Sequence, residues 1–341
     1  MSIAYVITTI QSPSPGVRRI AAQTQSSNDD FLVVIGDRKT PQDWSCSGAE
    51  FLSLAEQARM NLELVHHIPT DSYARKMLGY LAAAKAGADW IRETDDDNMP
   101  NDQFFSAVPD CLVGQTAPVT AEWFNPYTYF SDRFVWPRGF PLSWIKQREY
   151  GAAIDSGAEV APPYILQAVA NGDPDVDAIY RLSAHDTSSI EFHDRDPLAL
   201  PSGVWSPFNS QATSWPRELF ALMYLPVTCT FRMTDIWRSF VVQRLLPGLG
   251  GTLVFTAATV YQDRNEHDLL ADFEQEVPGY LGTERIRAVL ESTQTRGGGA
   301  NVLSDLRTLY EALIDGGFLT SGELPVLDAW IDDVRRLGLA S

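Results

Sequence analysis

The chain has 341 residues, of which 45% are hydrophobic, so it can bury a large core as one big domain or two modest ones. Its 44 acidic residues outnumber its 26 Lys and Arg residues and give a formal net charge of -18. This charge repels phosphate backbones and anionic membrane surfaces, so nucleic acid is not an expected partner. No window is long and apolar enough for a membrane span, and three widely separated cysteines argue against a disulfide framework. We therefore expect no membrane span and a reducing, cytoplasmic setting.

The first hundred residues predict alternating strands and helices. Residues 3–10 and 31–35 are short, β-branched runs typical of buried parallel strands, with a helix-sized polar segment between them. Residues 54–65 and 72–86 repeat apolar side chains at helical spacing, and residues 88–91 predict another strand. This order predicts a doubly wound α/β domain.

The pattern changes after Pro100. Aromatic residues, Pro and Gly crowd residues 123–144 and 201–216, which we interpret as loops that face a substrate. From about Asp263 the apolar period is helical, and the glycine and proline pairs, Pro278-Gly279 among them, are expected to separate the helices. The expected helices lie near 264–276, 283–293, 300–315 and 323–337. We therefore divide the chain into an α/β domain over 1–260 and a helical region over 261–341.

Three consecutive aspartates, Asp95, Asp96 and Asp97, follow the strand predicted at 88–91. Like charges this close raise one another's pKa unless a cation compensates them, and oxygen ligands suit Mg²⁺ or Mn²⁺. An isolated acidic triplet is more often a solvated loop that caps a following helix. The strand-end position favours a ligand site instead. We expect Asp95 and Asp97 to flank a bound diphosphate, with one carboxylate toward the ribose, one on the metal, and Asp96 in support.

Seven short segments are individually weak motifs but form a specific set. They are residues 7–10, 36–41 (GDRKTP), 72–76 with 79–81, 93–98 (ETDDDN), 171–178 (NGDPDVDA), 208–211 (FNSQ) and 234–238 (TDIWR). The set resembles the STELLO family of glycosyltransferase-like proteins over roughly residues 3–270. The resemblance implies a GT-A-type fold, in which the first strands bind the nucleotide and an Asp-x-Asp element, here Asp95 to Asp97, holds the metal. The chain differs from the plant STELLO pattern in lacking a membrane anchor, so a Golgi setting is not expected.

Residues 138–141 (RGFP) carry a more distant similarity, to the reversibly glycosylated polypeptides, which include UDP-arabinopyranose mutases. In that family the arginine that matches Arg138 becomes transiently glycosylated. The similarity therefore implies a second possible reaction, the isomerisation of a nucleotide sugar.

A nucleotide sugar is anionic, so this acidic chain needs local positive charge to bind one. Arg38 and Lys39 follow the strand at 31–35, and Arg75 and Lys76 lie near a helix start, so both pairs can reach the edge that carries the acidic triplet. Arginine grips phosphate with a bidentate fork and lysine acts as a point charge, which favours Arg75 and Lys76 as the phosphate ligands. Ordinary surface solvation is the alternative for each of these residues.

Further positions complete the expected donor site. Thr8 and Thr9, at the end of the first strand, are expected to contact the uracil or ribose, or else serve only as β-favouring residues. Asp37 belongs to the family-like segment at 36–41 and is a further nucleotide-contact candidate. His267 is a candidate to reach the diphosphate or complete the metal shell, with a helix-start role as the alternative.

A second group of acids could serve the acceptor. Asp173, Asp175 and Asp177 are typical of a turn whose carboxylates cap backbone amides, although they could also hold an acceptor. Asp177 precedes an apolar run, as a residue at a strand start would.

Asp235 is the candidate for chemistry on the acceptor, because transfer with inversion needs a carboxylate to take the proton of the acceptor hydroxyl. A retaining or mutase reaction needs a nucleophile or exchange site instead, and Arg138 would favour the mutase. The alternative for Asp235 is the N-cap of a helix predicted at 236–246.

The sequence therefore predicts a GT-A-type glycosyltransferase that uses a nucleotide-sugar donor, most simply a UDP-sugar, with Mn²⁺ or Mg²⁺ and an unidentified glycan or other acceptor. A nucleotide-sugar mutase and a non-catalytic, glycosyltransferase-like scaffold are the alternatives. The oligomeric state stays open.

Overall fold

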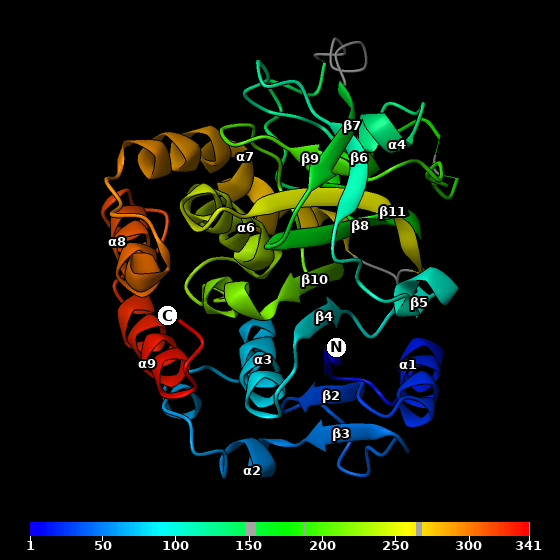
Figure 1. The fold of residues 1–341 in the computed structure, drawn as a ribbon, viewed down its shortest axis with the longest axis vertical. Helices are drawn as coiled ribbons and strands as arrows, with labels where there is room; N and C mark the ends of the chain where they lie inside the picture. Colours follow the sequence, from blue (N-terminus) through cyan, green and yellow to red (C-terminus); the bar gives the residue numbers. More distant parts are fainter. Residues whose placement is uncertain (147–154, 187, 264–267, 341) are drawn as a thin grey trace.

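The computed structural model describes residues 1–146, 155–186, 188–263 and 268–340. Its strands are β1 (Ile3–Thr9), β2 (Phe31–Gly36), β3 (Ala49–Leu52), β4 (Trp90–Thr94), β5 (Asn98–Pro100), β6 (Leu112–Thr116), β7 (Asp155–Val160), β8 (Tyr164–Gly172), β9 (Leu198–Leu200), β10 (Ala212–Pro216) and β11 (Thr252–Gln262). Across the described ranges these strands form one sheet in the order β3-β2-β1-β4-β10-β8-β11-β9-β6-β7, with β5 paired to β11 (Figure 1).

The direction of the strands decides where a ligand can bind. Strands β3, β2, β1 and β4 run parallel, and β10 is antiparallel to both β4 and β8. Strand β8 pairs in parallel with β11, so β1, β2, β4, β8 and β11 all end at the same edge. In open α/β sheets this carboxyl edge is where ligands bind.

The α-helices of the described ranges are α1 (Pro15–Ser26), α2 (Leu54–Gln57), α3 (Lys76–Lys85), α4 (Tyr127–Phe130), α5 (Ala178–Ser183), α6 (Thr234–Leu245), α7 (Leu269–Ser292), α8 (Val302–Asp315) and α9 (Glu323–Arg336). Short 3-10 helices are η1 (Leu64–His66), η2 (Tyr73–Arg75), η3 (Asp102–Phe105), η5 (Arg217–Leu222), η6 (Phe231–Met233), η7 (Leu246–Leu249) and η8 (Gly299–Asn301). None of the helices described is long and apolar enough to cross a membrane.

Alternate side chains of the first strands face two different cores, as the two-residue period of a strand requires. Val6 and Ile35 belong to the cluster that includes Met77 of α3, whereas Ile7 packs in the cluster that includes Val17 of α1. Helix α3 lies very close to the sheet, because a Cβ added at Gly79 would come within 2.6 Å of Val6 Cγ1. A glycine at this position is therefore required for the helix to pack against β1.

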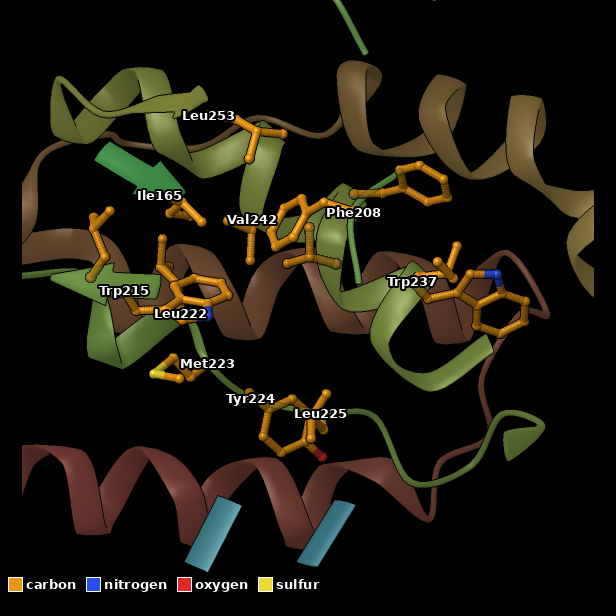
Figure 2. Packing of buried hydrophobic residues seen from close by; sticks show 14 of the residues in the cluster. Ile165, Phe208, Trp215, Leu222, Met223, Tyr224, Leu225, Trp237, Val242 and Leu253 are labelled. Atoms are coloured by element: carbon orange, nitrogen blue, oxygen red, sulfur yellow. The ribbon is translucent and has the colours of Figure 1, made fainter. Parts of the chain in front are cut away.

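The larger core lies between the sheet and the C-terminal helices. Figure 2 shows Ile165, Trp215, Val242 and Leu253 gathered in it, from β8, β10, α6 and β11. In Figure 1, α8 and α9 stack along one side of the molecule. Side chains of α8 and α9, such as Trp330, belong to the same core cluster.

The predicted α/β class is confirmed, with strands β1 and β2 and helices α1 and α3 close to where the sequence predicts them. The strand predicted at 88–91 is shifted, because β4 covers Trp90–Thr94. The continuous helix predicted over 54–65 is wrong. Helix α2 ends at Gln57, whose side-chain amide donates to the carbonyls of Gly36 and Leu52, and the chain forms only one further short 3-10 turn, η1. These tertiary hydrogen bonds offset the local helical preference.

Three other expectations need correction. The predicted break at Pro278-Gly279 is wrong, because α7 continues through Pro278 and Gly279 packs against Met233. The aromatic segments do not face a substrate as a whole, since Trp123 and Trp205 are buried in the core. Asp177 starts a helix rather than a strand: its Oδ1 accepts from Tyr180 N at 2.7 Å and caps α5.

Candidate functional site

A pocket of about 460 Å³ opens at the carboxyl edge of the sheet. This volume falls within the range of about 300–1,000 Å³ that is usual for small-ligand sites. Its wall comes from the ends of β1, β2, β4 and β11, from η2 and η6, and from the start of α6. Among the residues predicted for the site, the lining includes Thr8, Thr9, Asp37, Lys39, Arg75, Asp95, Asp96, Asp97, Arg138 and Asp235.

The first two aspartates of the triplet are held by neighbouring side chains. Asp95 Oδ1 accepts from Tyr73 Oη at 2.7 Å and from Lys76 Nζ at 2.9 Å. Asp96 Oδ2 accepts from the hydroxyl of Thr9 at 2.5 Å, and burial raises the pKa of the Asp96 carboxyl. The turn that follows β4 is therefore fixed to η2, α3 and the end of β1.

Asp97 is the least satisfied member of the triplet. Its Oδ2 accepts from Gln262 Nε2 at 3.0 Å, whereas its Oδ1 is buried and has no hydrogen-bond partner among the described residues. Burial first, and then the charge of Asp95, raise the pKa of Asp97 to about 6. A buried carboxylate oxygen without a donor is the arrangement that a hard divalent cation would stabilise.

The donor set suits a metal that takes several ligands from its substrate. Within the described ranges, no group of three or more His, Cys, Asp or Glu side chains is arranged to hold a metal ion. Mg²⁺ and similar ions commonly bind through one or two carboxylates plus waters and substrate phosphates, and Asp95 and Asp97 fit that pattern. His267, which we predicted as a third metal ligand, lies outside the described residues, so its role stays a prediction.

The four basic residues predicted to bind phosphate are placed very differently. Arg75 lines the pocket but is only 4% exposed, and its guanidinium donates to Gln57 Oε1 and to the carbonyl of Pro69. Lys76 is fully buried and donates to Asp95 and to the Ser210 carbonyl at 3.2 Å. Both residues that the sequence favoured are therefore already engaged inside the protein.

The other basic pair leaves one free charge. Arg38 lies outside the pocket lining and pairs with Asp71 at 3.3 Å. Lys39 is exposed, lines the pocket, and makes no hydrogen bond or ion pair with any other described residue. The geometry therefore favours Lys39 over Arg75 and Lys76 as the cation that meets an anionic ligand.

The far side of the pocket is a buried cluster of charges around Arg138. Its Nε and Nη2 donate to the two oxygens of Asp175 at 2.7 and 2.8 Å, and Nη1 donates to Asp235 Oδ1 at 3.1 Å and to the Arg232 carbonyl. Burial alone would lower the pKa of Arg138, but the Asp175 and Asp235 carboxylates raise it well above its ordinary value. Burial alone would raise the pKa of Asp175, but Arg138 holds it well below its usual range.

Asp235 lies in the first turn of α6, where the helix dipole stabilises negative charge. The alternative role as N-cap is wrong, because Met233 occupies that position. Its Oδ2 accepts from Arg138 Nη2, from Ser210 N and from Ser210 Oγ, each at 3.2 Å. Asp235 is thus held at the pocket wall by four hydrogen bonds, counting the one to Oδ1.

Several lining residues were not predicted. Asn209, Gln211 and Tyr73 lie in segments that carry the family resemblance, so the sequence marked their positions without giving them a role. Phe231, which is 59% exposed at the pocket, and Gln262 had no recognisable signal in the sequence. Phe231 and Gln262 reach the pocket because the fold brings η6 and the end of β11 to the edge that carries the aspartate triplet.

The structure thus combines an α/β sheet, a helical C-terminal region, and an aspartate triplet that follows the fourth parallel strand beside a pocket on the carboxyl edge. The sequence model of the STELLO glycosyltransferases matches residues 232–341. Two Arabidopsis thaliana proteins, "Probable glycosyltransferase STELLO2" and "Probable glycosyltransferase STELLO1", are 32% and 31% identical to the chain over 90% of its length. The chain is therefore related to the STELLO glycosyltransferases, as its motifs predict. It spans about two fifths of each relative, with 42% and 41% covered.

Solved structures give a fainter likeness. A structure described as a mycobacterial protein has a TM-score of 0.42 at 10% identity, over 84% of this chain and 74% of that one. Glucosyl-3-phosphoglycerate synthase of M. tuberculosis has a TM-score of 0.41 at 12% identity, over 83% of this chain and 80% of that one.

Proposed function

We propose that the chain is a metal-dependent glycosyltransferase that binds a nucleotide sugar, specifically a UDP-sugar, in the pocket at the carboxyl edge of its sheet. The single observation that carries the proposal is the state of Asp97: a buried carboxylate with one oxygen that has no partner among the described residues, next to two more aspartates. The relationship to the STELLO glycosyltransferases supports the same reading.

The charges of the pocket explain why a metal would be needed. Among the described residues that line it, seven are aspartates and four are Lys or Arg. The arginines Arg75, Arg138 and Arg232 are engaged by Gln57, by Asp175 with Asp235, and by Glu276. A diphosphate would therefore meet net negative charge, and among the described lining cations Lys39 is the one that no acidic side chain or other partner engages. A divalent cation on Asp95 and Asp97 would reverse that balance and stabilise the charge of the departing diphosphate.

The protein residues then have separate tasks. The ends of β1 and β2, with Thr8, Thr9 and Asp37, form the side of the pocket where the nucleoside would lie. Lys39 would meet the phosphates from the exposed rim. The Arg138 cluster on the opposite wall would face the sugar and the acceptor, which we propose to be a glycan or another hydroxyl compound.

The geometry favours transfer over the mutase reaction. A glycosylated arginine needs a guanidinium nitrogen that is deprotonated and able to reach the sugar. Every nitrogen of Arg138 donates to Asp175, Asp235 or the Arg232 carbonyl, and the flanking carboxylates keep the guanidinium charged. Asp235 keeps its place as the carboxylate that would accept the acceptor proton, although it would first have to loosen its hydrogen bonds to Arg138 and Ser210.

The test is to measure UDP binding by calorimetry with and without Mn²⁺, and then to follow UDP release from a panel of UDP-sugars. We expect UDP to bind to the unmodified protein only when Mn²⁺ is present. Added Mn²⁺ should give the Asp97→Asn protein no gain in affinity. An unchanged, metal-independent affinity in both proteins would overturn the proposal. Ring isomers without UDP release would indicate the mutase, and a panel without binding would indicate the scaffold. A cytoplasmic setting stays a prediction from the cysteine pattern.

A further inference from the structure

Two hydroxyl groups connect the two halves of the pocket. The hydroxyls of Tyr73 and Ser210 lie 2.5 Å apart. Tyr73 Oη also donates to Asp95 Oδ1, on the side that we propose for the metal and diphosphate. Ser210 Oγ also donates to Asp235 Oδ2, in the charge cluster on the opposite wall. A continuous path of hydrogen bonds therefore runs from Asp95 to Asp235.

The hydroxyls cannot make all of these bonds at once. Each hydroxyl carries one proton, so the pair has two protons to share among three contacts: Tyr73 to Asp95, Ser210 to Asp235, and Tyr73 to Ser210. Two oxygens 2.5 Å apart need a proton between them. One of the two carboxylates must therefore go without its hydroxyl donor.

The remaining partners keep both states possible. When Tyr73 turns its proton toward Ser210, Asp95 still accepts from Lys76 Nζ at 2.9 Å. When Ser210 turns its proton toward Tyr73, Asp235 still accepts from Ser210 N and from Arg138. Lys76 also donates to Tyr73 Oη at 2.7 Å. This bond uses a lone pair of the oxygen and not its proton, so the Tyr73 proton can still point to Asp95 or to Ser210. The pair can thus reverse without leaving a carboxylate unpaired.

We infer that Tyr73 and Ser210 are positioning residues that couple cation and diphosphate binding at Asp95 to the hydrogen bonding of Asp235. This inference rests on the proposed function. A cation on Asp95 repels the Tyr73 proton, which turns toward Ser210. Ser210 then donates to Asp235 and holds it at the pocket wall, and this bond must loosen again before Asp235 can accept the proton of an acceptor. Binding of the donor therefore orders the opposite wall of the pocket.

Ser210 offers a clean test because it is fully buried and does not line the pocket. An effect of Ser210→Ala on ligand affinity must therefore reach the ligand through another residue, which we identify as Tyr73. In Ser210→Ala the Tyr73 proton has no second acceptor and stays against Asp95, where it opposes the cation. Ser239 is a matched control, because it is also fully buried and its hydroxyl donates to the Ile236 carbonyl at 2.6 Å and to no other described residue.

The affinity for UDP in the presence of Mn²⁺ is measured by calorimetry for the unmodified protein, Ser210→Ala, Tyr73→Phe, the double variant and Ser239→Ala, with melting temperatures for all five. We expect Ser210→Ala to weaken binding about threefold or more, a coupling typical of groups in one network, and to have no further effect in the Tyr73→Phe background. Ser239→Ala should keep the affinity while losing similar stability.

The inference is overturned if Ser210→Ala binds as the unmodified protein does, if it weakens binding equally in the Tyr73→Phe background, or if Ser239→Ala has the same effect. Failure of the unmodified protein to bind UDP with Mn²⁺ would instead overturn the proposed function, and this inference with it. The two failures are therefore distinguishable in the first titration.

Discussion

Replacing Lys39 by alanine tests the electrostatic picture of the pocket most directly. Lys39 is the lining cation that no other described residue engages, so its charge is available to a ligand. We expect Lys39→Ala to weaken the binding of UDP with Mn²⁺ while leaving the fold intact, because Lys39 is exposed and makes no hydrogen bond or ion pair with another described residue.

The size of the effect follows from Coulomb's law. Two unit charges about 4 Å apart attract by about 1 kcal/mol in bulk water and about 4 kcal/mol near a protein surface of lower effective dielectric. Lys39 is exposed at the rim of a partly enclosed pocket, so the lower part of this range applies. A loss of about 1–2 kcal/mol corresponds to roughly five- to thirtyfold weaker binding.

The assay compares UDP, UMP and uridine, each titrated with Mn²⁺ at low and high salt. The loss should be largest for UDP, smaller for UMP and absent for uridine, and high salt should reduce it by screening. Arg38→Ala is the matched control, because Arg38 is the adjacent cation, lies outside the pocket lining and already pairs with Asp71. Equal losses for Arg38→Ala and Lys39→Ala, or an equal loss for uridine, would refute the reasoning.

Asp97→Asn should weaken the binding of UDP with Mn²⁺ by at least about tenfold and remove the gain in affinity that added metal gives. The control Asp102→Asn, at an exposed aspartate, should keep the affinity of the unmodified protein. Calorimetry at fixed Mn²⁺ compares the two variants, and equal affinities would contradict a metal at Asp97. Asp177 has a pKa raised to about 7, chiefly by burial, above its unfolded value. The stability that Asp177 contributes is therefore complete below about pH 4 and is lost as the pH rises to about 7. In urea unfolding, the free energy of unfolding of Asp177→Asn should fall less steeply with pH over this window than that of the unmodified protein, by up to about 1.4 kcal/mol per pH unit. An unchanged slope would contradict the raised pKa. Asp333 is fully buried and accepts from the backbone amides of Glu63 and Leu64, both at 2.8 Å. Asp333→Ala should therefore lower the free energy of unfolding by about 2–5 kcal/mol. The control Asp332→Ala, at an exposed aspartate, should lower it by less than about 0.5 kcal/mol. Similar losses in these two variants would contradict the buried hydrogen bonds.

The parts of the fold that the sequence predicts are those that local pattern decides. Strands β1 and β2 are short runs of apolar or β-branched residues bounded by polar or turn residues, and their buried faces leave little choice of conformation. Strand β4 is less regular, because it also carries the buried charges of Arg92 and Glu93. The order of β10, β8, β11, β9, β6 and β7 depends on pairings between distant segments. Strand β9, with three residues, has no period that a sequence could reveal.

The same limit applies to the site. The position of the triplet followed from one strand and the acids after it, so the sequence was sufficient to place it. The sequence was not sufficient to choose between Lys39 and Arg75 as the phosphate ligand. Arg75 is engaged by Gln57, a residue 18 positions earlier whose role depends on where α2 ends. Charge and residue type show which side chains could bind phosphate, but only packing shows which of them are free.

The Arg138 cluster shows how the helical C-terminal region contributes to the pocket. Arg232, whose carbonyl accepts from Arg138, is held through its guanidinium by Glu276 of α7, which is fully buried. The same Glu276 accepts from the backbone amide of Ala178, at the start of α5, just after the loop that carries Asp175. One carboxylate from α7 thus fixes both segments that hold Arg138 in place. Since an unpaired buried charge is costly, removing Glu276 would disturb the wall of the pocket that carries Arg138, which we propose faces the acceptor, although Glu276 does not line the pocket itself.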